Sequence, residues 1–325
     1  MANISKLELL QAFGFPRDPF KHFTMKSNDH ERIGKVVTMA VKDKAMVSVV
    51  GERGIGKSNA VRCALGKMKT IRLVYTHSND INKLLIGDIE QALILDLSSE
   101  KPKRGREIRA RQLRRILGEA STRMDVVLVI EEAHCLHGMT LRSLKRIREM
   151  EWMGKSELFS VLLICQSDPM NKPGVSEVRL RSDSIQMKGL SQDEISIYIS
   201  RAVGSTFDQK AIEAICKRPD SHNYEDLKGM LFQLMEKALF AGRRKVIIED
   251  VVSVFGYENL EDMRKKAGLS KADIAKKTGI SPRDVSKILK GEGVNNQNPS
   301  VNSLRDFLDQ YQNDDTGESQ QVANG

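Results

Sequence analysis

Three short, largely apolar segments interrupt the otherwise mixed pattern of this chain, at residues 46–50, 126–130 and 159–164. Runs of five or six such residues are typical of strands that are buried on both faces of a parallel sheet. After residue 190 the pattern changes to helical periodicity, with amphipathic stretches at 192–202 and 224–241. The order of these elements predicts an α/β domain followed by a helical part.

The first apolar run leads directly into a glycine-rich loop. Residues 51–58 read GERGIGKS and match the pattern G-x-x-x-x-G-K-[ST]. Glycines let backbone N–H groups approach crowded phosphate oxygens, the lysine bridges the β- and γ-phosphates, and the serine hydroxyl binds Mg²⁺. A helix expected over residues 59–68 would direct its positive end at the anion. The pattern therefore predicts a site for ATP and Mg²⁺ formed by Gly51, Glu52, Arg53, Gly54, Ile55, Gly56, Lys57, Ser58 and Asn59.

Polar residues follow the other two apolar runs. Glu131 and Glu132 end the segment that begins at residue 126, and ligands bind at this end of strands in open α/β sheets. We assign Glu131 to Mg²⁺, together with Ser58, and Glu132 to the attacking water. The alternative is an acidic pair on the surface. Gln166, or Ser167 beside it, would sense the γ-phosphate after the third run, unless an ordinary turn stands there.

This order of motifs over residues 10–255 resembles the AAA+ ATPases. The resemblance implies a phosphate-loop parallel sheet flanked by helices, with a small helical lid, and a catalytic set that includes Lys57, Glu132 and Gln166. It also implies an arginine that reaches the γ-phosphate of a neighbouring subunit. Arg181 is our choice for this role and Arg179 the alternative, although either would also fit a solvated basic face. The lid usually carries another arginine, but residues 222–228 contain none.

Two further features concern the ends of the expected ATPase region. Residues 13–20, FGFPRDPF, form a stiff apolar strap. In a subgroup of secretion and transposition ATPases a similar stretch packs near adenine; a strap over the core, without nucleotide contact, is the alternative. We expect boundaries at 1–25 (strap), 26–190 (α/β subdomain), 191–256 (lid), 257–312 (helix-turn-helix domain) and 313–325 (disordered tail).

The charge of the chain indicates a polyanionic partner. Its 325 residues carry a formal net charge of +9, and basic residues gather on either side of the second apolar run. Such elements would follow the phosphates of duplex DNA without sequence preference, and the alternative is a solvated helix face. The candidates for DNA contact are Lys103, Arg104, Arg106, Arg109, Lys145 and Arg146.

Residues 269–291 resemble the helix-turn-helix of phage repressors. Ala275 is small where two helices would cross, Gly279 permits a tight turn, and Ser281 would cap the second helix. That helix would lie in the major groove and direct Arg283 and Lys287 to DNA. A helical hairpin used for protein contact is the alternative. The small all-α domain would thus follow the ATPase core.

The combination of core, basic charge and helix-turn-helix resembles the DNA-transposition ATPases, the group of the phage Mu B protein and the TnsC-like and TniB-like regulators. This resemblance implies ATP-bound subunits that polymerise on double-stranded DNA, as a ring or a helical filament, and deliver it to a transposase. One departure is that the Mu B protein carries its helix-turn-helix before the core. The rival interpretations are a sequence-specific regulator or replication initiator and a secretion ATPase of the ExeA type.

The remaining sequence features concern the compartment. No apolar stretch is long enough to span a bilayer, and the first residues lack the apolar core of a signal peptide. The four cysteines have no metal or redox spacing. We therefore expect a cytoplasmic protein, in a bacterium or a phage-infected cell, with no membrane partner.

Overall fold

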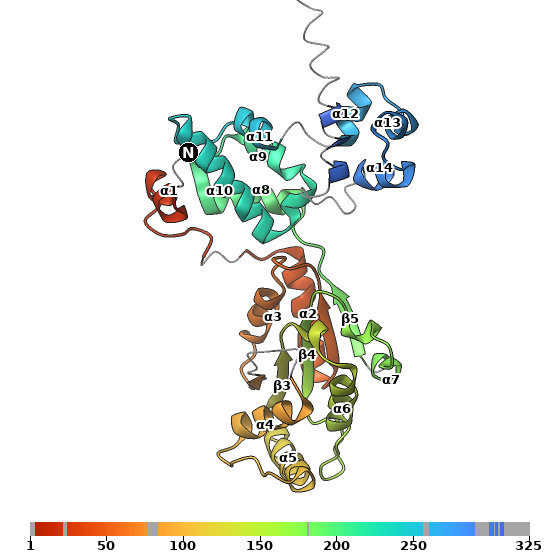
Figure 1. The fold of residues 1–325 in the computed structure, drawn as a ribbon. Helices are drawn as coiled ribbons and strands as arrows, with labels where there is room; N and C mark the ends of the chain where they lie inside the picture. Colours follow the sequence, from red (N-terminus) through yellow and green to blue (C-terminus); the bar gives the residue numbers. More distant parts are fainter. Residues whose placement is uncertain are drawn as a thin grey trace, which may run out of the picture. The chain divides into compact units, whose positions relative to one another are not determined.

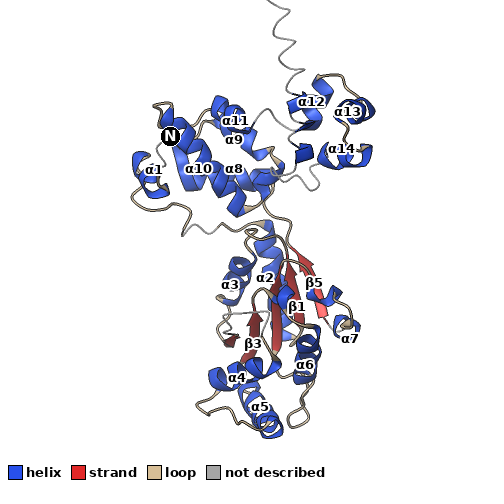
Figure 2. Ribbon diagram, viewed as in Figure 1, coloured by secondary structure: helices blue, strands red, loops and turns tan. Residues whose placement is uncertain are grey.

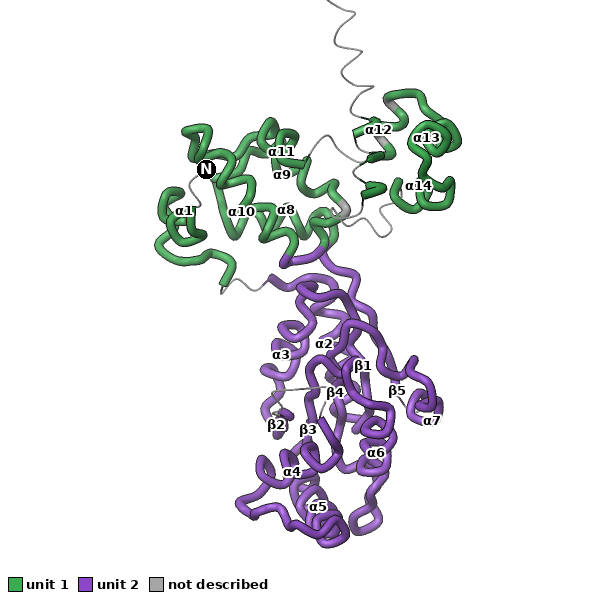
Figure 3. Tube along the Cα trace, viewed as in Figure 1, with its two compact units in different colours: residues 1–23, 191–222, 226–325 green, residues 24–190, 223–225 purple. Residues whose placement is uncertain are grey.

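The computed structural model describes residues 4–21, 25–76, 84–180, 182–255, 260–289, 299–301, 303–304 and 306–308. The chain divides into two compact units, which Figure 3 shows in different colours. The first, here called the sheet unit, consists of Thr24–Leu190 and Asn223–Glu225. The second, here called the helical unit, consists of Met1–Phe23, Ser191–His222 and Asp226–Gly325.

The sheet unit is built around five parallel strands, drawn in red in Figure 2. Their order in the sheet is β2-β3-β4-β1-β5, and the central strand β4 aligns Leu162 with Val47 of β1. The strands are β1 Met46–Val50, β2 Ile71–Tyr75, β3 Asp125–Ile130, β4 Ser160–Cys165 and β5 Ser182–Gln186. The parallel sheet predicted from the apolar runs is confirmed, with the third run displaced by one residue.

Helices cover both faces of this sheet (Figure 1). Alternate residues of β1 face opposite layers, since Val47 and Val49 pack in one core and Met46 and Val50 in the other. The first core includes helices α2 (Asn28–Lys42) and α3 (Lys57–Leu65). The second includes α4 (Ile86–Leu97), α5 (Arg106–Ser121), α6 (Gly138–Arg148) and the short α7 (Ser176–Arg179). The result is a three-layer arrangement that leaves the strand ends open to ligands.

The helical unit contains the strap and the expected lid. Its helices are α1 (Lys6–Ala12), α8 (Gln192–Val203), α9 (Gln209–Cys216), α10 (Tyr224–Phe240) and α11 (Ile248–Phe255), of which α10 takes its first two residues from the sheet unit. The strap's Phe20 packs 6.1 Å from the ring of Tyr198 and 5.5 Å from that of Phe232. Lys228 pairs with Asp18 at 3.0 Å. The strap is therefore fixed to α8 and α10.

The carboxy-terminal part of the helical unit contains α12 (Leu260–Lys266), α13 (Lys271–Thr278) and α14 (Pro282–Leu289). Gly279 ends α13 with a left-handed φ of 71°, as the tight turn requires. Ser281 accepts a hydrogen bond from the Asp284 amide, so it caps the first turn of α14 as predicted. Ile274, Val285 and Ile288 are buried together, which closes a small core. The expected tail lies outside the described residues.

Among the described residues, no helix is both long and apolar enough to cross a membrane.

Candidate nucleotide-binding site

The loop after β1 requires glycine at two positions. Gly54 and Gly56 have φ values of 82° and 97°, in the left-handed region that other residues rarely adopt. A Cβ on Gly54 would lie 2.5 Å from Cβ of Glu225, and a Cβ on Gly56 would lie 3.2 Å from the ring of Tyr224. The loop is therefore both sterically crowded and strained for larger side chains, as a closely wrapped phosphate cradle requires.

Lys57 begins α3 immediately after the loop, and its side chain points back into it. The residue is 8% exposed, and Nζ donates a hydrogen bond to the Glu52 carbonyl at 2.6 Å. Burial lowers the pKa of Lys57, while the negative charge of Glu132 opposes this effect. A largely desolvated ammonium group beside a glycine-rich loop suits a phosphate, because the attraction is weakly screened there.

The metal-side residues come together across two elements. Ser58, on α3, donates a hydrogen bond from Oγ to Oε2 of Glu131, at the end of β3, over 3.3 Å. A hydroxyl and a carboxylate are hard oxygen donors of the kind that Mg²⁺ prefers. No group of three or more His, Cys, Asp or Glu side chains in the described part of the chain could hold a metal. The two oxygens thus fit a magnesium ion that also binds phosphates and water.

Glu132 adopts a strained backbone beside this pair, with φ 50° and ψ 34°. Gln166, just beyond β4, donates a hydrogen bond from Nε2 to Oε2 of Glu132 over 3.3 Å. Nδ1 of His134 lies 3.5 Å from the same oxygen. Left-handed geometry at a non-glycine residue is more common at functional sites, and here it places a carboxylate among polar partners. The two strand ends that the sequence singled out therefore meet.

The other predicted loop residues have different roles. Ile55 is 2% exposed and packs in the core shared with α2 and α3. Glu52, Arg53 and Asn59 are exposed. A Cβ on Gly51 would lie 3.1 Å from Ile55, so this glycine also stands in a tight place.

The two arginine candidates fall in different positions. Arg179 is the last residue of α7 and is exposed. Arg181 lies outside the described residues. An exposed arginine at the end of a short helix is available to a neighbouring subunit, and the assignment between the two stays a prediction.

Sequence reasoning missed the contribution of residues 223–225 to this site. Asn223, 2% exposed, donates a hydrogen bond from Nδ2 to the Arg53 carbonyl at 2.7 Å, across 170 positions of the chain. Tyr224 lies against Gly56, and its ring is 6.3 Å from that of His30 in an edge arrangement. Residues 222–228, in which the sequence shows no arginine, thus contact the phosphate loop through the amide of Asn223 and the ring of Tyr224. No local pattern reveals such a contact.

The two histidines that follow β3, His134 and His137, have different roles. In the structure His134 contacts Glu132, while His137 caps α6 by accepting a hydrogen bond from the Met139 amide at 3.2 Å. One histidine thus adjoins the predicted catalytic carboxylate and the other has a structural function.

The predicted DNA-contacting residues differ in their availability. Lys103, Arg104 and Arg106 are exposed before and at the start of α5. Arg109 forms an ion pair with Glu90 at 2.7 Å, and Lys145 pairs with Glu177 at 3.3 Å. The exposed residues also include Arg146 on α6 and both candidates on α14, Arg283 and Lys287.

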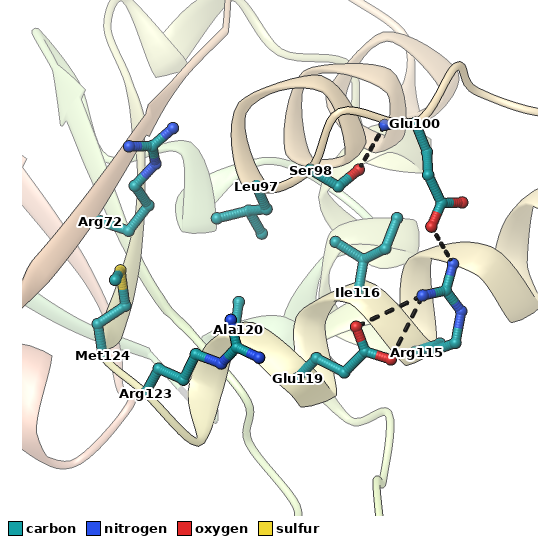
Figure 4. Close-up of a pocket in the computed structure, with 10 residues that line it drawn as sticks. All are labelled: Arg72, Leu97, Ser98, Glu100, Arg115, Ile116, Glu119, Ala120, Arg123 and Met124. Atoms are coloured by element: carbon teal, nitrogen blue, oxygen red, sulfur yellow. Dashed lines mark hydrogen bonds and ion pairs between the residues drawn. The ribbon is translucent and has the colours of Figure 1, made fainter.

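A pocket of about 200 Å³ lies beside α5 (Figure 4). It is found near the beginnings of β2 and β3, the ends of the strands opposite to the phosphate loop. Glu100, Arg115 and Glu119 form a chain of ion pairs along one side. Its lining contains none of the residues predicted from the sequence.

Two parts of the chain match known protein families. Residues 40–170 match the family described as AAA domain, and residues 260–309 match the family described as helix-turn-helix. No curated protein matches the chain in sequence.

Three solved structures share the fold at low sequence identity. Cdc6p from Pyrobaculum aerophilum is 16% identical with a TM-score of 0.55, and the match covers 94% of this chain and 91% of that one. The ORC2 protein of Aeropyrum pernix is 12% identical with a TM-score of 0.53, and the match covers 93% of this chain and 98% of that one. A chain of the Drosophila ORC bound to DNA is 13% identical with a TM-score of 0.55, and the match covers 97% of this chain and 86% of that one.

These matches agree with the fold described above. The AAA+ fold predicted from the sequence, with a helix-turn-helix domain at the carboxy-terminal side, is confirmed. The AAA-domain match and the nucleotide-binding geometry support an ATPase of the AAA+ type that carries a helix-turn-helix DNA-binding domain.

Proposed function

We propose that this protein hydrolyses ATP, assembles on duplex DNA with little sequence preference in its ATP-bound state, and delivers that DNA to a transposase. The observation that supports the proposal is a pair of hydrogen bonds at one edge of the sheet. One joins Ser58 to Glu131 and the other joins Gln166 to Glu132. The proposal rests on these four side chains and not on the fold alone.

Each side chain has a distinct task in hydrolysis. Lys57 exchanges the Glu52 carbonyl for phosphate oxygens and offsets their charge. Magnesium, when bound, would neutralise charge on the β- and γ-phosphates. Ser58 and Glu131 would hold it through their side-chain oxygens. Glu132 accepts a proton from the attacking water, and Gln166 keeps the Glu132 carboxylate oriented through its amide.

Assembly and hydrolysis are coupled through an arginine supplied by a neighbouring subunit. Arg179, exposed at the end of α7, or Arg181 beyond it would reach the γ-phosphate bound by the next protomer. Because that contact requires both the triphosphate and the neighbour, it makes ATP a condition for polymerisation. Hydrolysis would then weaken the assembly.

DNA is held through its phosphates. We assign this contact to exposed cations of the sheet unit. Arg283 and Lys287 of α14 would face DNA from the second helix of the helix-turn-helix. Contacts with phosphates carry no sequence information, so affinity depends on salt far more than on base sequence. The transposase as recipient rests on the resemblance in motif order and charge to the transposition ATPases.

Sedimentation with a random 60-base-pair duplex tests the proposal. The parental chain should sediment with DNA as a large assembly in ATP and release it in ADP, whereas Lys57→Ala should not assemble in either nucleotide. Equal sedimentation of the parental chain with ATP, ADP and no nucleotide would rule out ATP-controlled assembly.

One observation favours a second candidate, a sequence-specific regulator or replication initiator. The matches to Cdc6p and ORC2 extend over more than nine-tenths of this chain, so they take in its ATPase core and most of the part that contains the helix-turn-helix. The Mu B protein carries its helix-turn-helix before the core. Competition between random and selected duplexes separates the two functions, since only a regulator should prefer particular sequences by a large ratio.

A further inference from the structure

The loop between α4 and α5, residues 98–105, is held in place by one buried side chain. Gln112, on the inward face of α5, is 6% exposed. Its Oε1 accepts a hydrogen bond from the Lys103 amide at 3.0 Å, and its Nε2 donates to Oε2 of Glu100 at 2.9 Å and to the Lys101 carbonyl at 3.1 Å. Both donors and the oxygen of this amide are thus used to fix three residues of the loop.

Two ion pairs add to this bracing. Arg109 pairs with Glu90 at 2.7 Å, where both side chains are about 15% exposed, and Nη1 of Arg109 also donates to the Lys103 carbonyl at 3.4 Å. Arg115 pairs with Glu100, the same residue that accepts from Gln112 (Figure 4). Polar bonds therefore fix the loop from the helix side at residues 100, 101 and 103.

The braced loop presents cations on its outer side. Lys101, Lys103, Arg104 and Arg106 are exposed within six positions of the chain. None of these four side chains forms an ion pair or a hydrogen bond with other residues that the structure describes. Like charges held close together repel one another, so a fold that fixes them in one place suits a polyanion that would neutralise them.

The chemistry of the surroundings selects the polyanion. Residues 98–121 contain no aromatic side chain on which unpaired bases could stack. Arginine and lysine contact phosphate oxygens, and closely spaced phosphates are the repeating feature of a duplex. A loop already fixed in its bound shape loses less conformational entropy when it binds.

We propose that residues 100–106, the end of this loop and the first residue of α5, are a preformed docking surface for the phosphate backbone of duplex DNA and that Gln112 is the residue that positions it. This inference rests on the proposed function, because it names the surface by which the sheet unit holds DNA. It assigns Arg109 to the support of the loop rather than to direct contact with phosphates. Arg104 and Arg106 make the contacts, with Lys101 and Lys103 beside them.

Fluorescence anisotropy of the full-length chain with a labelled random 30-base-pair duplex, titrated at several salt concentrations with ATP present, tests this. Arg104→Ala/Arg106→Ala should raise Kd about tenfold and reduce the slope of log K against log salt by about two, one for each phosphate that the variant no longer neutralises. Arg104→Lys/Arg106→Lys should stay within about twofold of the parental Kd, because a lysine also neutralises a phosphate.

Gln112→Leu tests the positioning role. It keeps the size of the side chain and removes the three hydrogen bonds, so it should raise Kd about fivefold and increase hydrogen exchange at the Lys103 amide. Arg123→Ala is the matched control, since it removes another exposed cation of the sheet unit, outside the loop, and should leave Kd within about 1.5-fold. If Gln112→Leu does not fold, the affinity of Arg104→Ala/Arg106→Ala for duplex still tests the docking surface.

The outcomes separate this inference from the proposed function. If Arg104→Ala/Arg106→Ala, or a folded Gln112→Leu, binds duplex with the parental Kd, the docking surface is wrong, although the chain still binds DNA. A loss of affinity per removed charge in Arg123→Ala as large as that in the arginine pair shows that total charge alone matters and also overturns it. If polyglutamate competes as strongly as unlabelled duplex, the partner of this surface is an acidic protein and not DNA. A parental chain that binds no duplex at all contradicts the proposed function instead.

Discussion

Oγ of Ser58 donates a hydrogen bond to Oε2 of Glu131 over 3.3 Å, although 73 positions of the chain separate the two residues. The contact exists because β1 and β3 end at the same edge of a parallel sheet, so that the residues following each strand meet. It places both proposed magnesium donors next to Glu132, the proposed base.

Removal of the loop lysine should abolish tight ATP binding. Lys57→Ala deletes a buried ammonium group whose charge-assisted bonds to phosphate each contribute about 1.5–3 kcal/mol, so the affinity for a fluorescent ATP analogue should fall at least 10- to 100-fold. Lys67→Ala, at an exposed position just after α3, should bind as the parent does. Similar affinity in both variants would show that Lys57 does not contact the phosphates.

Glu132→Gln should separate binding from hydrolysis. The amide cannot accept a proton from water, so kcat should fall by about 10²–10⁴ while the affinity for ATP stays within about threefold. Steady-state phosphate release and analogue binding measure the two quantities. Glu131→Gln should instead raise the magnesium concentration needed for half-maximal ATP binding. Hydrolysis by Glu132→Gln at the parental rate would remove this residue from its role.

Two inactive variants should restore each other's activity if an arginine acts between subunits. Arg179→Ala/Arg181→Ala keeps its own phosphate loop but lacks the arginine, and Lys57→Ala lacks the loop lysine but offers the arginine. Each alone should be nearly inactive in DNA-stimulated hydrolysis. A 1:1 mixture should recover roughly a quarter to a half of the parental rate. A mixture no more active than the sum of its parts contradicts the intersubunit role.

Gly118→Ala should destabilise the sheet unit. A Cβ at this position of α5 would lie 2.1 Å from the ring of Trp152, so the tryptophan must move, at a cost of about 1–3 kcal/mol in the free energy of unfolding. Gly34→Ala in α2 is the control, because an added Cβ would meet nothing within 4 Å beyond its chain neighbours and its own helix backbone, and alanine favours a helix by about 0.5–1 kcal/mol. Thermal unfolding of both variants should show shifts of opposite sign; a stabilised Gly118→Ala would mean that Trp152 does not pack there.

Arg283→Ala/Lys287→Ala should weaken binding to all duplexes by a similar factor if α14 supplies phosphate contacts. Lys276→Ala, at an exposed position on α13, is the comparison. Anisotropy with several unrelated duplexes measures the effect. Weaker binding to one sequence only would favour the regulator, and unchanged binding to every duplex would favour protein contact by this domain.

The sequence revealed the interior of the sheet better than its edges. The central strands β1, β3 and β4 are buried along almost their whole length, so they appear as uninterrupted apolar runs. The edge strands β2 and β5 are only partly buried, and β5 reads SDSIQ, a sequence with no strand signal. Edge strands tolerate polar residues because one side faces solvent.

The phosphate loop was also readable from the sequence, because its chemistry lies in eight consecutive residues. The contact of Asn223 with Arg53 was not, since 170 positions separate them and asparagine carries no motif. The same limit explains Arg109, whose pairing with Glu90 depends on the crossing of two helices. Charge patterns indicate where cations gather but not which of them fold inward.

Electron microscopy of the purified chain with random duplex DNA in ATP, in ADP and without nucleotide is the most direct test of ATP-controlled assembly on DNA. We expect regular protein coats on DNA in ATP only, and bare DNA or scattered subunits in the other two conditions. Isolated single subunits on DNA whatever the nucleotide, or identical coats in all three conditions, would contradict this mechanism.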